Sequence, residues 1–160
     1  MNDIEAAKLD VAGDIGLDIN YLNPPHEKHF DPATLVFSVA GEFVLAYLLG
    51  ILKQLIVAGS IELGKFVSDE LGRYHAERGA EYIKKRLASD SSADQTLTQV
   101  AHATASLSQK MTVADLRAIS ETSEAALIEA LEELHFPKSQ ARKIAKSVQK
   151  HTNDKILKSV

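Results

Sequence analysis

The chain has 160 residues, of which 45% are hydrophobic and 25% charged, and this composition excludes a disordered chain. It contains no cysteine, which excludes disulfide bonds and thiolate metal sites. The net charge is −4, yet residues 136–160 hold seven Lys/Arg and one acid, Asp154, so only the C-terminal part is basic.

The N-terminal residues 1–32 contain two competing patterns. Over 9–21 hydrophobic side chains mostly take odd positions and polar ones even positions, which predicts a lone N-terminal strand. The alternative is a short helix over 3–12 that ends at Gly13 and is followed by an extended coil. Three prolines within 23–32 predict a loop after either structure, because proline lacks a backbone donor and disfavours helix before it.

This proline-rich loop contains the candidate metal ligands of the chain, His26, His29 and Asp31. Two imidazoles three residues apart in a turn can converge, and first-row metals bind imidazole and carboxylate groups. Exposed loops also carry histidines that bind nothing, and no further histidine lies close in sequence. We therefore predict no metal and no cofactor, and keep the three residues as candidates.

Residues 33–88 are predicted to form a long apolar helical hairpin. One helix is expected over 33–58, followed by a break at Gly59 and Ser60 and by a second helix that ends near residue 88. The second helix is amphipathic and ends with Lys-Lys-Arg at 84–86. These cations suit the negative end of a helix dipole, and they would also suit contact with anionic lipid headgroups.

The stretch 43–61, which begins in the first helix and extends past its predicted end, contains a single charge, Lys53, and is long enough to cross a bilayer. Its apolar side chains favour insertion by about 5 kcal/mol, whereas a central lysine costs about 3 kcal/mol and the polar residues and glycines add to that cost. Insertion is therefore marginal. The stretch remains a candidate for entering a membrane as part of an oligomer.

Polar residues of this helix fall on one narrow side, and the rest of its surface is apolar. This pattern is typical of a helix that is buried on most sides within a bundle or an oligomer. The stripe consists of Ser38, Glu42, Lys53 and Ser60. The residues expected to form the core or an oligomer interface are Phe43, Tyr47, Leu48, Ile51 and Leu55.

A polar hinge is predicted at 89–93, between the hairpin and a small C-terminal helical bundle over 94–160. The fold class is therefore expected to be all-α. Helices are predicted at 94–109, 112–119, 123–135 and 138–151, with Thr112 and Thr122 near the starts of two of them and Pro137 before the last.

Residues 112–136 have the spacing of a helix-turn-helix. The second of its helices carries four glutamates and no Lys or Arg, and these carboxylates would repel a phosphate backbone. DNA reading by this helix is therefore not expected.

The segment 126–148, ALIEALEELHFPKSQARKIAKSV, resembles ubiquitin-associated-like and RuvA C-terminal-like helical modules. In those families a Leu-rich helix, a tight turn with an aromatic residue and an Ala-rich helix pack together. His135 stands where those families usually have glycine. The resemblance implies protein binding, and its matching positions are Leu131, Leu134, Phe136, Ala141, Ile144 and Ala145.

A basic face follows in the last predicted helix, where five cations are spaced by three and four residues or adjoin one another and so lie along one side. This face is the candidate surface for a nucleic acid or an acidic partner, although a solvated helix surface explains it as well. Its residues are Lys138, Arg142, Lys143, Lys146 and Lys150.

The chain has no Gly-rich nucleotide motif, phosphate loop or serine-hydrolase motif, so we expect no enzyme and infer no small-molecule substrate. The leading hypothesis is a non-catalytic helical protein-interaction or assembly module that binds another protein or itself. The alternatives are a membrane-active effector that uses 33–67 and a nucleic-acid-binding protein that uses the basic helix. Residues 1–10 lack the features of a secretory signal, so a cytoplasmic location is expected, with membrane association as the alternative.

Overall fold

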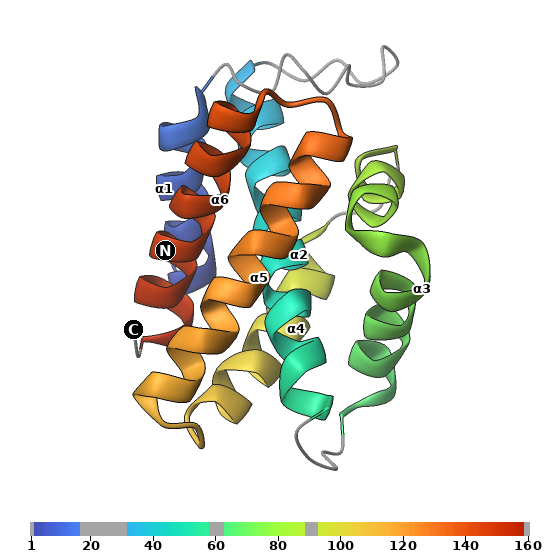
Figure 1. Cartoon of the computed structure of the whole chain (residues 1–160), viewed down its shortest axis with the longest axis vertical. Coiled ribbons are helices and arrows are strands. Elements are labelled where there is room, and N and C mark those ends of the chain that lie inside the picture. Colours follow the sequence, from blue (N-terminus) through green and yellow to red (C-terminus); the bar gives the residue numbers. More distant parts are fainter. Residues whose placement is uncertain (1, 17–31, 58–62, 89–92, 159–160) are drawn as a thin grey trace.

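The computed structural model describes residues 2–16, 32–57, 63–88 and 93–158. These residues form an all-α bundle, and no strand occurs among them, so the predicted fold class is confirmed (Figure 1). The elements are α1 (Asp3–Ile15), α2 (Pro32–Val57), α3 (Lys65–Ala88), α4 (Ala93–Ser108), α5 (Val113–Glu133), α6 (Lys138–Thr152) and the π-helix η2 (Asn153–Leu157).

Helix α1 corrects the prediction of an N-terminal strand. The helical alternative is confirmed, but the helix continues through Gly13 and ends at Gly16, which has a φ of +48°. Its interior positions Ala7, Val11 and Ile15 are four residues apart, lie on one face of the helix and are fully buried. A helix also pairs its own backbone groups, which a lone strand cannot do. The rest of the predicted strand, 17–21, lies outside the described residues.

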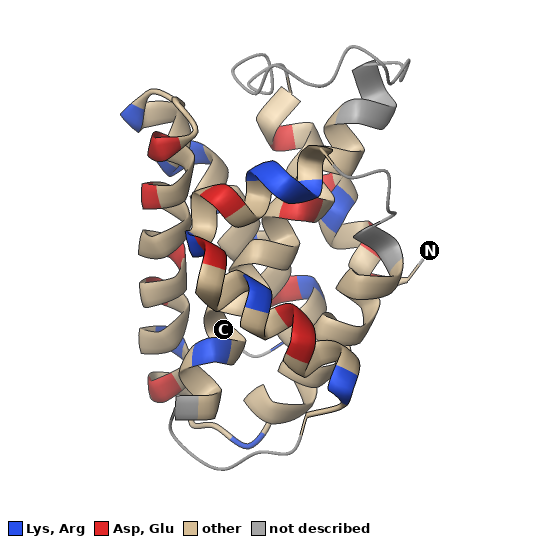
Figure 2. Ribbon diagram, turned by 90° about the vertical axis from the view of Figure 1, so that its right-hand side faces the viewer, with Lys and Arg blue, Asp and Glu red and all other residues tan. Residues whose placement is uncertain are grey.

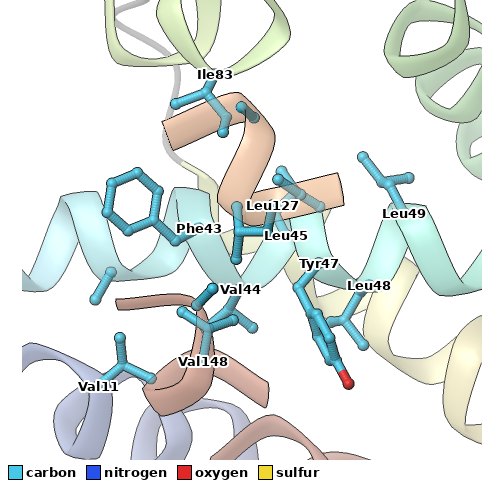
Figure 3. Close-up of a cluster of buried hydrophobic side chains, with 14 of the residues drawn as sticks. Val11, Phe43, Val44, Leu45, Tyr47, Leu48, Leu49, Ile83, Leu127 and Val148 are labelled. Atoms are coloured by element: carbon cyan, nitrogen blue, oxygen red, sulfur yellow. The ribbon is translucent and has the colours of Figure 1, made fainter. Parts of the chain in front are cut away.

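Helix α2 is the centre of the bundle and contacts each of the other five α-helices. Fourteen consecutive residues, 39–52, are buried without interruption. Figure 3 shows Val11 of α1, Leu127 of α5 and Val148 of α6 lying around side chains of α2. Each large apolar side chain buried in this way contributes about 1.5–3 kcal/mol. The hairpin and the C-terminal helices therefore share one hydrophobic core.

Helix α3 lies at the edge of the bundle in Figure 1. The break predicted at Gly59 and Ser60, between α2 and α3, lies outside the described residues. Helix α3 itself changes direction at Arg78, whose φ of 62° and ψ of 160° interrupt the helix. The next residue, Gly79, packs so closely on α5 that an added Cβ would lie 3.0 Å from Cβ of Ala130. The kink thus occurs where α3 approaches α5.

Helix α5 is continuous, which corrects the predicted break between 119 and 123 and with it the helix-turn-helix. Polar residues at the predicted break are accommodated inside the helix: Ser120 and Ser123 are buried. Thr122, expected near a helix start, lies inside the helix, and its hydroxyl donates to the carbonyl of Ala118. The cap at Thr112 is confirmed, since its hydroxyl accepts from the backbone N–H of Asp115 at 3.1 Å.

A tight turn reverses the chain between α5 and α6. His135 in this turn has a φ of 75°, a left-handed conformation that glycine adopts more readily. Phe136 is buried and meets Phe43 of α2 edge to face, with ring centroids 6.3 Å apart. Pro137 stands directly before α6, as predicted.

Candidate functional site

A polar groove of about 720 Å³ lies between α5 and α6, two antiparallel helices that run side by side in Figure 1. One wall comes from α5 and the other from α6, and the first turn of η2 closes one end. The wall and floor residues are Arg117, Ser120, Glu121, Glu124, Lys146, Gln149, Lys150, Asn153 and Asp154.

The floor of the groove is a network of neutral polar groups around Tyr47 of α2. The Tyr47 hydroxyl donates to Oδ1 of Asn153 at 2.7 Å and lies 2.6 Å from Oγ of Ser120. Nδ2 of Asn153 and Nε2 of Gln149 donate to the same Ser120 oxygen at 2.8 and 3.1 Å. Burial raises the pKa of Tyr47, so the hydroxyl stays protonated. The network joins α2, α5, α6 and η2 and holds the groove walls in place.

The walls carry opposite charges that do not neutralise each other. Glu121 and Glu124 belong to the α5 wall, and Lys146 and Lys150 to the α6 wall. Within the part of the chain that the structure describes, none of these four side chains forms an ion pair within 4 Å. The groove therefore presents carboxylates on one wall and ammonium groups on the other, with no salt bridge between them in the described part of the chain.

The predicted basic face lies on the outer side of α6. All five of its cations are exposed, whereas Ala141, Ile144 and Val148 on the opposite side of the helix are fully buried. Lys146 and Lys150 are the members that line the groove. The structure thus brings part of the basic face together with the glutamates of α5.

The predicted interface residues Phe43, Tyr47, Leu48, Ile51 and Leu55 lie in the core of the chain, with at most 3% of their surface exposed. Helices α1, α3, α4, α5 and α6 cover the apolar sides of α2, so the core alternative describes these residues. Their burial agrees with the first of the two alternatives, the core, and leaves these side chains no exposed surface for an oligomer interface.

The predicted polar stripe is divided by the fold. Ser38 and Lys53 are exposed, Glu42 is buried, and Ser60 lies outside the described residues. Glu42 accepts from Nε of Arg86 at 3.0 Å and from its second guanidinium nitrogen at 3.5 Å. Arg86, one of the cations expected to suit the helix dipole or anionic headgroups, enters the bundle and joins α3 to α2.

A second buried carboxylate, Glu70, extends this charged cluster. It accepts from the hydroxyl of Tyr82 and from Arg73 at 3.1 Å, and it lies 4.0 Å from Arg86. Burial raises the pKa of Glu42, an effect that the hydrogen bond and the charge of Arg86 oppose. Burial also raises the pKa of Tyr82, and its hydrogen bond to Glu70 adds to the shift. The cluster is structural, since its charges are paired and enclosed.

Asp14, Ser147 and His151 bring together the residue types of a hydrolytic triad, but their geometry differs from one. The Ser147 hydroxyl donates to Oδ2 of Asp14 at 2.7 Å, and Nε2 of His151 lies 2.8 Å from that same oxygen. The imidazole is therefore not placed to accept the serine proton. The hydrogen bond from Ser147, followed by the contact with His151, lowers the pKa of Asp14. These contacts link α1 to α6.

No group of His, Asp and Glu within the described residues could hold a metal ion. The candidates His26, His29 and Asp31 lie outside the described residues, so that prediction stays untested. Residues Val36–Ile56 of α2 are long and apolar enough to cross a membrane, but 83% of an apolar 18-residue window within this stretch is buried in the bundle. A core helix of a soluble protein has the same properties, so the membrane prediction gains little from them.

Comparisons of the chain with protein-family models, with curated proteins and with solved structures find no match. The six positions that carry the resemblance to ubiquitin-associated-like modules are all buried. Phe136 in the turn packs on α2, so these residues stabilise the bundle and do not form an open binding surface.

Several groove residues were missed from the sequence. Arg117, Glu121 and Glu124 are spaced by four and three residues and would have marked one side of a helix. The predicted break after residue 119 separated them. Asn153 carried no signal, because its partners Tyr47 and Ser120 are 106 and 33 residues away.

Proposed function

We propose that this chain is a non-catalytic helical protein-interaction or assembly module, and that its docking surface is the groove between α5 and α6 with its charged walls. One observation carries the proposal: carboxylates and ammonium groups face each other across one groove, and in the described structure they form no ion pair with each other. A bound protein segment could pair with both walls.

The apolar core does not support docking, because its large side chains are already covered. The exposed large hydrophobic residues of the described chain are Leu9, Phe66 and Val113, which lie on three different helices. They form no common patch on one helix face of the kind that marks an apolar interface. Recognition through this fold would therefore depend on charge and hydrogen bonds.

The mixed charge of the groove favours a protein over a nucleic acid. Lys146 and Lys150 would attract phosphates, but Glu121 and Glu124 line the same groove and would repel them. A protein segment can carry both signs of charge. The net charge of −4 further disfavours a polyanionic partner.

Capture of proteins from source cells, followed by identification by mass spectrometry, tests the proposal. The wild type is compared with Lys146→Glu/Lys150→Glu and with the control Lys53→Glu/Lys84→Glu, which makes the same charge change at exposed positions of α2 and α3. We expect the same protein to be retained by the wild type and the control and lost by the α6 variant.

The nucleic-acid alternative is measured with a duplex DNA and a single-stranded RNA at low salt. Binding that falls steeply with salt and is lost only in the α6 variant, with no protein captured, would overturn the proposal. The membrane alternative requires α2 to leave the core and Glu42 to lose Arg86. Dye release from anionic vesicles by the purified chain, from mildly acidic to neutral pH, would favour it.

A further inference from the structure

We infer that the partner of the α5–α6 groove is a second copy of this chain, bound about a two-fold axis that runs along the groove. The inference rests on the proposed function and names the partner of the same surface. It follows from the order of charges along the two walls and from the symmetry of pairs of identical chains, which most often form two-fold dimers.

The register of the two walls is set by hydrogen bonds. Ser120 of α5 accepts from Gln149 at 3.1 Å and from Asn153 at 2.8 Å. These two bonds place Ser120 level with the segment between Gln149 and Asn153. Since the helices are antiparallel, going forward along α5 from Ser120 corresponds to going backward along α6 from this segment. Glu121 and Glu124 are thus level with Lys150 and Lys146.

The signs are reversed at the end of the groove nearest η2. There Arg117 belongs to the α5 wall, and Asp154 belongs to the η2 side. Arg117 precedes Ser120 and Asp154 follows Asn153, so these two are also level with each other. Each charge on the α5 wall therefore has an opposite charge at the same height on the facing wall.

A two-fold axis along the groove preserves height and exchanges the walls. It places α5 of one copy over α6 of the other, so that Glu121 and Glu124 face the partner's Lys146 and Lys150, and Arg117 faces the partner's Asp154. An in-plane axis across the helices would place α5 over α5 and α6 over α6. That arrangement also reverses height along the helices. With the axis level with Glu121 and Lys150, Arg117 would face the partner's Glu124, but Glu121 and Lys150 would each face their own counterpart. Only the first axis places unlike charges together at every height, so the charge pattern selects it.

The contrast with α3 supports this selection. Figure 2 looks at the α3 side of the molecule, where acidic and basic residues alternate along the ribbon that faces the viewer. Such a surface has no separate acidic and basic strips and offers no preferred register. On the α5–α6 face the signs are separated between two walls, and the Tyr47 network holds these walls in a fixed arrangement.

Two variants with reversed walls test the inference. The first, Lys146→Glu/Lys150→Glu, makes both walls acidic; the second, Glu121→Lys/Glu124→Lys, makes both basic. We expect the wild type to dimerise in sedimentation experiments at low salt and to dissociate as salt is raised. Each variant alone should dimerise at least about tenfold more weakly, because like charges then face each other at two symmetric places.

An equal mixture of the two variants should restore the dimer as a heterodimer, because acidic walls then face basic walls throughout. Circular dichroism melts establish that each variant is folded, and Lys53→Glu/Lys84→Glu should dimerise like the wild type. A wild type that stays monomeric at low salt would overturn the inference, although face-dependent capture of another protein would leave the proposed function standing. If each folded variant dimerises by itself as tightly as the wild type, or if the two variants form no heterodimer when mixed, the inference that acidic walls pair with basic walls would be overturned.

Discussion

Two buried polar clusters lie five residues apart on α2 and are built from different chemistry. Around Glu42 the groups are charged, with the carboxylates of Glu42 and Glu70 held by Arg86 between α2 and α3. Around Tyr47 they are neutral hydroxyls and amides that join α2 to α5 and α6. The first cluster is enclosed, whereas the second forms the floor of an open groove.

The difference shows that one helix, α2, can supply polar groups both to an enclosed cluster and to the floor of a surface groove. A buried charge that loses its partner is far more costly than a buried hydroxyl that loses a hydrogen bond. The charged cluster should therefore respond most strongly to substitution, and the neutral one should respond less while changing the walls of the groove. The following substitutions measure this order.

Replacing Arg86 with leucine should have the largest effect. Glu42 would remain buried without its guanidinium partner, and we expect a loss of about 3–5 kcal/mol in the free energy of unfolding. Urea denaturation at neutral pH measures it. The double variant Glu42→Leu/Arg86→Leu should recover most of the loss, since it removes both charges. A double variant as unstable as the single one would mean that Arg86 acts through packing alone.

Replacing Tyr47 with phenylalanine should cost less, about 1–3 kcal/mol, because Asn153 then loses a buried donor. Tyr74→Phe is the matched control, since the Tyr74 hydroxyl forms no hydrogen bond with the described residues. Denaturation of both variants under the same conditions compares them. Equal stability of the two variants would contradict a structural role for the Tyr47 network.

Replacing Gly50 with alanine tests the packing beside that network. The added Cβ would lie 2.5 Å from Oγ of Ser123, which donates to the carbonyl of Tyr47 at 2.7 Å. We expect a loss of about 1–2 kcal/mol, because the serine can rotate away only by giving up its hydrogen bond. The cost should shrink when Ser123→Ala is also present, and an unchanged cost would locate the strain elsewhere.

The smallest effect is expected for Asp14→Asn, because this carboxylate is half exposed. The pKa of Asp14 is lowered in the folded chain, so its contribution is present above the unfolded value of about 3.9 and is lost as pH falls through the folded value. The variant should be slightly less stable than the wild type at neutral pH and equal to it in strong acid. Denaturation midpoints of the variant and the wild type at the two pH values measure the difference. A difference in midpoint that persists in strong acid would contradict the explanation that the ionised carboxylate of Asp14 stabilises the fold.

Much of the fold could be predicted from local pattern. The expected helices 33–58 and 138–151 correspond to α2, Pro32–Val57, and α6, Lys138–Thr152, within one or two residues. Their apolar periodicity and the prolines at their starts are local signals. The errors arose where polar residues are satisfied by distant partners: a break was predicted between 119 and 123, but Ser120 and Ser123 form hydrogen bonds with Tyr47 and the helix continues.

The sequence by itself determined an all-α chain, an apolar central helix and a basic outer face on the last long helix, because these follow from side chains within a few turns of one another. Tertiary structure decided which polar residues are buried. Glu42 meets Arg86 across 44 residues, and Tyr47 meets Asn153 across 106, so neither pairing has a local signature. The tight turn places α5 beside α6, and distant contacts such as that of Tyr47 with Ser120 and Asn153 pack the pair on α2 and form the floor of the groove.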